Sequence, residues 1–127
     1  MRLLLDTHVL LWWLADDRRL KSPERHVIAH RDALVYVSAV SVWEIAIKKS
    51  LGRLDLDTEV LERELDAGDM NELPVRWRHA KVTAALPTHH HDPFDRLLIA
   101  QAQSEGLTVV TYDRAFRPYD VAVLPSD

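Results

Sequence analysis

Short apolar runs alternate along the chain with longer segments in which apolar residues recur every three or four positions. The runs Leu3–Leu5, Leu34–Val37 and Thr108–Thr111 have the length and composition of buried strands. They are apolar throughout rather than at alternate positions, which is typical of a parallel sheet covered on both faces. Shorter runs at Leu73–Val75 and Val121–Leu124 predict a strand that enters a helix and one further strand.

The segments between these runs carry the start and stop signals of helices. Thr7, Ser22, Ser41 and Thr58 are expected to cap helices, with Glu44 as the reciprocal partner of Ser41 in a capping box. The expected helices span Val9–Ala15, Ser22 to about His30, Ser41 to near Gly52, Thr58 to Gly68, Trp77 to Pro87 and Asp92 to Gly106. The alternation predicts a single α/β domain over residues 1–127, built on a short, mostly parallel sheet.

Composition narrows the class of protein. The 127 residues contain no cysteine, and the longest apolar run, Val9–Ala15, is shorter than the ~20 residues that cross a bilayer. We therefore expect a cytoplasmic protein without a membrane anchor. A formal net charge of −4 disfavours a protein that coats nucleic acid by charge alone. It leaves open an enzyme that receives phosphate through bound divalent cations.

Four acidic residues lie at unusual places in this pattern. Asp6 and Asp113 follow predicted strands, whereas Glu44 and Asp95 are expected in the first turns of helices with apolar stripes. Strand carboxyl ends and the following helix amino ends share one edge of a parallel sheet, so the four carboxylates are expected to converge. Each also has an ordinary explanation. Glu44 fits the capping box or a pair with Lys48, Asp95 fits the helix dipole, and the other two fit turns or caps.

A cluster of carboxylates would repel itself and raise its own pKa values unless a cation neutralised it. Oxygen ligands in this number suit Mg²⁺ or Mn²⁺ rather than zinc.

The motifs, taken in order, resemble those of PIN-domain proteins, and among them the VapC-type toxins of bacterial toxin–antitoxin pairs. The residues that carry the resemblance are Leu4-Leu5-Asp6-Thr7-His8, Ser41-Val42-Trp43-Glu44-Ile45 with Lys48, His91-Asp92-Pro93-Phe94-Asp95-Arg96 and Thr111-Tyr112-Asp113. The resemblance spans essentially the whole chain. It implies a three-layer α/β/α sandwich, an Mg²⁺- or Mn²⁺-dependent endoribonuclease, a cognate antitoxin and a homodimer.

The resemblance also implies roles for individual residues. Asp6, Glu44, Asp95 and Asp113 would be the four metal-binding acids in chain order, and Asp92 is interpreted as a helix cap. We expect Asp6 and Asp95 to hold the principal ion, with Glu44 and Asp113 completing its shell or holding a second ion. Thr7 or Thr111 would orient ligands by hydrogen bonds, and Arg96 and Arg114 would lie nearest the phosphate of an RNA substrate.

The triplet His89-His90-His91 has no counterpart in the family pattern as a whole. It could bind zinc or nickel, but consecutive loop residues rarely face one ion, so we interpret it as a polar loop.

Three other functions compete with the ribonuclease. One is a PIN-like binding module without catalytic activity, and another is a DNA-directed nuclease of the same fold. The third, a phosphoacceptor receiver domain, is disfavoured because Asp6 stands alone after the first strand and Tyr112-Asp113 ends the late one.

Overall fold

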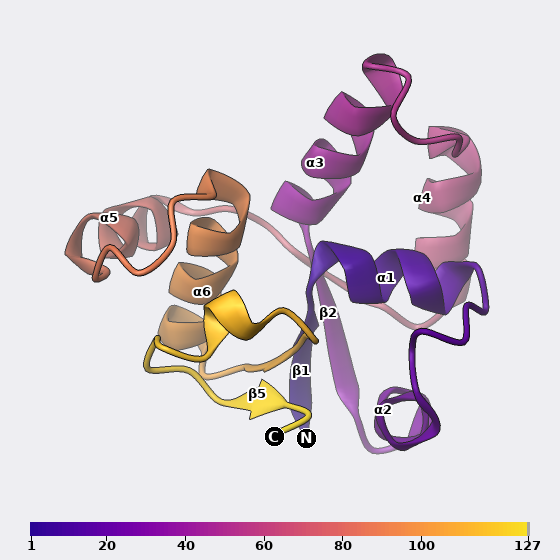
Figure 1. Ribbon diagram of the computed structural model, residues 1–127. Helices are drawn as coiled ribbons and strands as arrows, with labels where there is room; N and C mark the ends of the chain where they lie inside the picture. The colour runs from indigo at the N-terminus through magenta and orange to yellow at the C-terminus, as the bar shows by residue number, and fades with distance from the viewer. Residues whose placement is uncertain (127) are drawn as a thin grey trace.

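The computed structural model describes residues 1–126, in which strands and helices alternate (Figure 1). In chain order the elements are β1 (Arg2–Leu5), α1 (Thr7–Leu14), α2 (Ser22–Ala29), β2 (Leu34–Ser38), α3 (Ala39–Ser50), α4 (Thr58–Ala67), β3 (Asn71–Leu73), α5 (Trp77–Ala85), α6 (Pro93–Glu105), β4 (Thr108–Val110), the 3₁₀ turn η1 (Arg114–Phe116) and β5 (Val123–Leu124). No helix in this part of the chain is both long and apolar enough to cross a membrane.

The strands form one sheet in the order β3-β2-β1-β4-β5, and every neighbouring pair is parallel. The predicted α/β class with a short parallel sheet is therefore confirmed. β1 lies at the centre, with Leu3 beside Val35 of β2 on one side and Thr108 of β4 on the other. α1 and α3 begin where β1 and β2 end, at the upper edge of the sheet in Figure 1.

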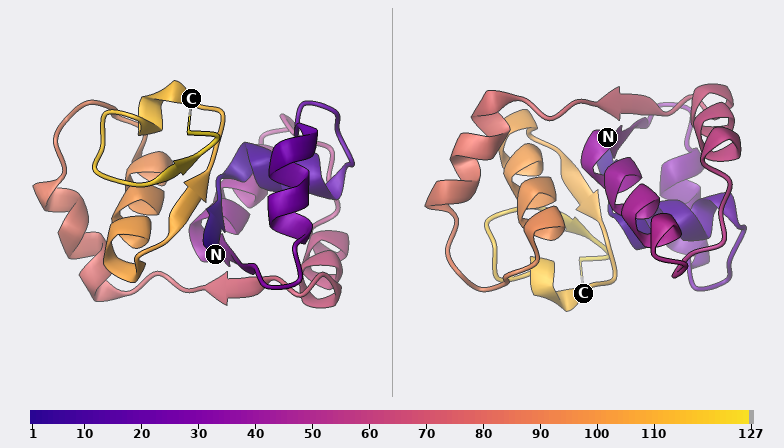
Figure 2. Two further views of the ribbon diagram at one scale, coloured as in Figure 1. Left: turned by 90° about the horizontal axis from the view of Figure 1, so that it is seen from below. Right: turned by 90° about the horizontal axis from the view of Figure 1, so that it is seen from above.

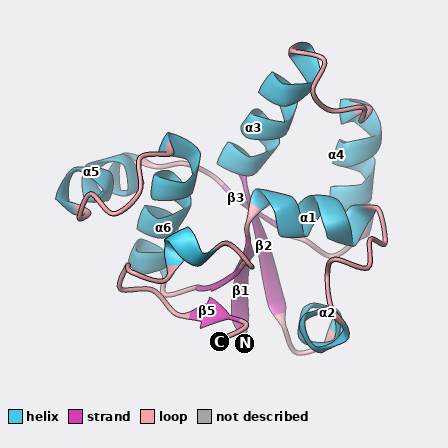
Figure 3. Cartoon of the chain, viewed as in Figure 1, coloured by secondary structure: helices cyan, strands magenta, loops and turns pink. Residues whose placement is uncertain are grey.

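Helices cover both faces of this sheet, as expected for strands that are apolar throughout. Viewed along the strands, α5 and α6 lie on one side, and α1, α2, α3 and α4 lie mainly on the other (Figure 2). The strands are enclosed between these helical layers (Figure 3). Leu3 and Leu5 of β1 point into the core under α1, whereas Leu4 points to the core under α6. Each of these leucines is fully buried, which contributes about 1.5–3 kcal/mol per side chain.

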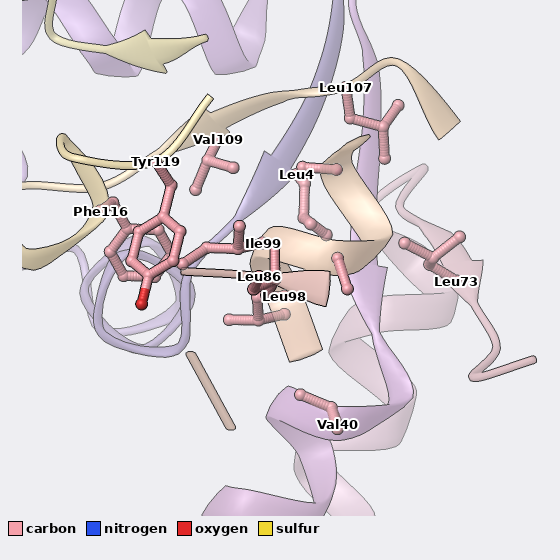
Figure 4. Packing of buried hydrophobic residues seen from close by; sticks show 12 residues of the cluster. Leu4, Val40, Leu73, Leu86, Leu98, Ile99, Leu107, Val109, Phe116 and Tyr119 are labelled. Atoms are coloured by element: carbon pink, nitrogen blue, oxygen red, sulfur yellow. The ribbon is translucent and has the colours of Figure 1, made fainter. Parts of the chain in front are cut away.

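The core under α6 also includes residues that follow β4 in the chain. Leu98 and Ile99 of α6 pack with Val109 of β4, Phe116 and Tyr119 (Figure 4). The Tyr119 ring belongs to this cluster, while its hydroxyl extends away from the apolar side chains. That hydroxyl is consequently available to the polar loop before α6.

Several helix starts differ by a few residues from the predictions. Asp6, not Thr7, caps α1, and Asp57, not Thr58, caps α4, because the aspartate carboxylate accepts a nearby backbone N–H in each case. α2 has Lys21 at its N-cap and no side-chain cap, although Pro23 does lie in its first turn. In the third strand, Asn71–Leu73 replaces the expected Leu73–Val75.

The predicted capping box of α3 is wrong. Ser38 caps this helix through Val40 N, so Ser41 and Glu44 lie inside it, and Glu44 is in the second turn rather than the first. The physical reason is that β2 passes directly into α3 without a loop, which moves the helix start three residues earlier.

Candidate functional site

Asp6 is the first residue after β1 and is 96% removed from solvent, with 4% of its surface exposed. Its Oδ1 accepts the backbone N–H of Val9 at 2.8 Å, and its Oδ2 accepts the hydroxyl of Thr111. Burial raises the pKa of Asp6 above its usual value, and the charge of Asp113 adds to this rise, while the two hydrogen bonds oppose it. The two hydrogen bonds hold the Asp6 carboxylate in a fixed orientation at the end of β1.

Asp95 lies in the first turn of α6, as predicted, and reaches the same edge because α6 precedes β4 and begins where the strands end. Asp92 caps this helix, accepting the N–H groups of Phe94 at 2.8 Å and of Asp95 at 3.1 Å. This contact agrees with the interpretation of Asp92 as a cap.

The electrostatic surroundings of Asp95 resemble those of Asp6. Burial raises the pKa of Asp95 to about 6, a hydrogen bond from His90 opposes this, and the charges of Asp92 and Asp6 add to the rise. The charge of Asp113 thus contributes to the raised pKa of Asp6, and the charge of Asp6 contributes to that of Asp95.

Asp113 follows β4 and the connecting Thr111-Tyr112, and its side chain is exposed at the rim. Its Oδ1 accepts the N–H of Ala115 at 2.9 Å and so caps η1. The backbone N–H of Asp113 in turn donates to Thr111 Oγ1 at 3.0 Å. Thr111 therefore connects the turn of Asp113 with the carboxylate of Asp6.

Glu44 is buried on α3 and connects to Asp6 through the intervening residue Thr7. The Thr7 hydroxyl donates to Glu44 Oε1 at 2.7 Å and lies 3.1 Å from Ser41 Oγ. The second carboxylate oxygen, Oε2, forms an ion pair with Lys48 Nζ at 3.0 Å. Glu44 thus has the pair with Lys48 that the sequence suggested as an alternative, and it lies behind Asp6.

The tightest group of possible ligands in the described chain consists of His90, Asp95 and Asp113, with one atom from each lying within 4.8 Å of the others. Sequence reasoning missed His90, because three consecutive histidines indicated only a polar loop. The proximity of the triplet to Asp95 in sequence was the one available signal.

The two arginines expected near phosphate are placed differently. Arg114 is exposed at the start of η1, beside Asp113. The Arg96 guanidinium instead donates to the carbonyl of Pro87, in the loop before α6, at 2.9 Å, to that of Thr83 in α5 at 3.0 Å, and to the Tyr119 hydroxyl at 3.2 Å. These donors are occupied by the protein itself, so the expected contact of Arg96 with phosphate does not fit this geometry.

The oxygen donors fit a hard divalent cation. The buried Asp6 and the half-buried Asp95 both have raised pKa values, and Asp113 lies exposed at the rim; Mg²⁺ or Mn²⁺ would relieve the repulsion between these carboxylates. The imidazole of His90 is the one nitrogen donor in the group of three possible ligands identified within residues 1–126.

Comparisons with known proteins show the family to which the chain belongs. A family model of the PIN domain matches residues 3–122. The chain belongs to the PIN-domain family. A curated protein, Ribonuclease VapC22 of Mycobacterium tuberculosis, is 35% identical to this chain over 119 residues, which are 91% of this chain and 90% of the relative.

Solved structures share the PIN fold of this chain. VapBC2 from Rickettsia felis, bound to a DNA fragment from its promoter, matches with a TM-score of 0.70 at 15% identity over 97% of both chains. FitAcB from Neisseria gonorrhoeae matches with a TM-score of 0.64 at 27% identity over 98% of this chain and 97% of that chain. VapBC-1 from nontypeable Haemophilus influenzae matches with a TM-score of 0.65 at 16% identity over 97% of this chain and 96% of that chain.

Proposed function

We propose that this PIN-domain protein is an endoribonuclease that acts as the toxin of a toxin–antitoxin pair and depends on Mg²⁺ or Mn²⁺. The observation that carries the proposal is that Asp95 and Asp113 offer ligand atoms within 4.8 Å of each other, beside the buried Asp6, in a chain 35% identical to Ribonuclease VapC22. A cytoplasmic location fits a chain that has no cysteine and acts on RNA.

Asp6 and Asp95 are the proposed principal ligands, Asp113 completes their group at the rim, and Glu44 is the fourth acid. When bound, the cation supplies activation of water and neutralisation of charge on the phosphoryl oxygens. The protein's contribution is orientation. Thr111 and Val9 hold the two oxygens of Asp6, and Asp92 fixes the first turn of α6, from which Asp95 projects.

Glu44 is buried, as Asp6 is, but both of its carboxylate oxygens already have partners within the protein. Thr7 donates to one of its oxygens and Lys48 pairs with the other, so its charge is partly compensated without a metal ion. We therefore assign Glu44 to the outer part of the metal shell, where it fixes Thr7 directly after Asp6. Arg114, exposed beside Asp113, is the proposed contact for the RNA phosphate.

The proposed partners are a cognate antitoxin and a second copy of the chain. The solved relatives include VapBC and FitAcB assemblies, and this chain exposes large aromatic side chains of the kind found at interfaces. Trp77 on α5 is 91% exposed and Trp43 on α3 is 60% exposed. Tryptophan is enriched in protein interfaces relative to the rest of the surface.

Cleavage of defined single-stranded RNAs by the purified protein tests the activity. We expect cleavage with Mg²⁺ or Mn²⁺, none with chelator, and a loss of at least about 100-fold in Asp6→Asn and Asp95→Asn. Asp55→Asn, which changes an exposed carboxylate between α3 and α4, is the matched control and should cleave normally.

Each alternative function has its own outcome in this assay. A binding module would leave every RNA intact with every ion, and a DNA-directed nuclease would cleave DNA of the same sequence faster than RNA. Full RNA cleavage by Asp95→Asn would refute the assignment of the site.

A further inference from the structure

We propose that His90 is a direct ligand of the metal ion, through Nε2, so that the site combines one imidazole nitrogen with carboxylate oxygens. This proposal rests on the proposed metal-dependent function. It assigns a role to the middle histidine of a triplet that neither the family motifs nor the acids explain.

The geometry of the three side chains fits one ion. His90 Nε2 lies 2.9 Å from Asp95 Oδ2, and Asp113 offers an oxygen within 4.8 Å of both. Ligands at about 2.1 Å from an octahedral ion are about 3 Å apart when adjacent and about 4 Å apart when opposite. The nitrogen is therefore already near the separation from Asp95 that two adjacent ligands require.

The backbone of His90 is held in place by residues from two other parts of the chain. Its N–H donates to the Tyr119 hydroxyl at 2.9 Å, and its carbonyl accepts from Arg96 Nη1 at 3.3 Å. The Tyr119 ring is packed in the core, and Arg96 binds two further carbonyls, of Pro87 in the loop and of Thr83 in α5. These contacts explain why Arg96 turns away from the rim: it fixes the loop that presents His90.

The neighbouring histidines have other surroundings. The ring of His89 packs edge-on against Tyr119, with centroids 5.2 Å apart, and His91 is exposed. The objection to a metal role was that three consecutive loop residues rarely face one ion. A single ligand from the triplet avoids that objection. Only its middle member belongs to the ligand group identified within residues 1–126.

An imidazole ligand changes which cation the site prefers. Mg²⁺ takes oxygen ligands, whereas an imidazole nitrogen suits first-row transition metals, among which Mn²⁺ also takes carboxylate and water oxygens. We infer that this protein binds Mn²⁺ in clear preference to Mg²⁺, and that the preference depends on His90.

Pulsed electron paramagnetic resonance on the full chain loaded with Mn²⁺ tests the nitrogen bond directly. A coordinated imidazole couples its ¹⁴N nucleus to the electron spin of Mn²⁺, whereas a histidine that only hydrogen-bonds to Asp95 does not give this strong coupling. We expect the coupling in the wild type and its loss in His90→Gln, whose amide can still donate to Asp95. His91→Gln is the matched control from the same loop and should keep the coupling.

Binding titrations supply a second readout. We expect His90→Gln to lose at least about tenfold in Mn²⁺ affinity while its Mg²⁺ affinity changes less than about threefold. His91→Gln should change neither. Urea unfolding in chelator verifies that each variant is folded.

The outcomes separate this proposal from the function on which it rests. Binding of Mn²⁺ by the wild type without nitrogen coupling overturns the role of His90 and leaves the carboxylate site standing. Coupling that persists in His90→Gln also overturns it and points to another histidine, such as His8 near Asp6. A failure of the wild type to bind Mn²⁺ or Mg²⁺ at all overturns both proposals.

Discussion

The raised pKa of Asp95 makes the metal-free protein less stable than it could be. Burial, together with the charges of Asp92 and Asp6, moves this pKa from its ordinary value of 3.8 to about 6. As the pH rises, the unfolded chain loses the proton of Asp95 before the folded protein does. The free energy of unfolding therefore falls between about pH 4 and pH 6 and stays lower above that range.

The substitution Asp95→Asn removes this fall in the free energy of unfolding and keeps a side chain of nearly the same shape. The amide oxygen can still accept the hydrogen bond from His90, but the side chain no longer ionises. The rise from 3.8 to about 6 corresponds to at most about 3 kcal/mol, and the side chain is only 18% exposed, so solvent screens little of it. We expect Asp95→Asn to be more stable than the wild type by about 1–3 kcal/mol at pH 7 in chelator.

Urea unfolding of both proteins at a series of pH values from about 3.5 to 8 measures this difference. Plotted against pH, the free energies of unfolding of the wild type and of Asp95→Asn should coincide at the acid end. They should diverge between about pH 4 and pH 6 and differ by a constant amount above pH 6. A difference that does not vary with pH, or a less stable variant at pH 7, would refute the electrostatic reasoning. Asp55→Asn, at an exposed position, should follow the wild type throughout.

Four further predictions concern the same edge of the sheet and its surroundings. Mg²⁺ should raise the melting temperature of the wild type more than that of Asp95→Asn, and equal shifts in calorimetry would exclude Asp95 as a ligand. Thr111→Val removes the hydroxyl that donates to buried Asp6, so urea unfolding at pH 7 should show a loss of about 1–3 kcal/mol, accompanied by weaker cleavage. Arg96→Lys should lower stability by about 1–3 kcal/mol, because lysine cannot reproduce the planar set of donors; unchanged stability with only a higher KM for RNA would instead restore the phosphate role. Trp77→Ser should weaken self-association in sedimentation equilibrium at least about tenfold while changing monomer stability by less than about 0.5 kcal/mol, and an unaltered dimer would place the interface elsewhere.

The sequence alone was sufficient for the parts of the fold that depend on short-range patterns. Continuous apolar runs predicted the strands of a parallel sheet, because a strand buried on both faces needs apolar residues at every position. Leu3, Leu4 and Leu5 show this directly, since they alternate between the two cores and all are fully buried. The same topology argument predicted that Asp6, Glu44, Asp95 and Asp113 would share an edge. Asp95 and Asp113 offer ligand atoms within 4.8 Å of each other, and the charge of Asp6 raises the pKa of Asp95, whereas Glu44 pairs with Lys48. Their role as metal ligands stays a prediction.

Tertiary structure decided which side chains face that edge and which atoms of those side chains form hydrogen bonds there. Thr111 donates to Asp6 across 105 positions of sequence, and Tyr119 holds His90 across 29, so neither contact has a local signal. Arg96 follows Asp95 directly, yet its guanidinium binds backbone carbonyls, because adjacent helical residues point in different directions. Residue types and spacing determined that carboxylates would meet at this edge. Only the packing of the loop before α6 decided that an imidazole would join them.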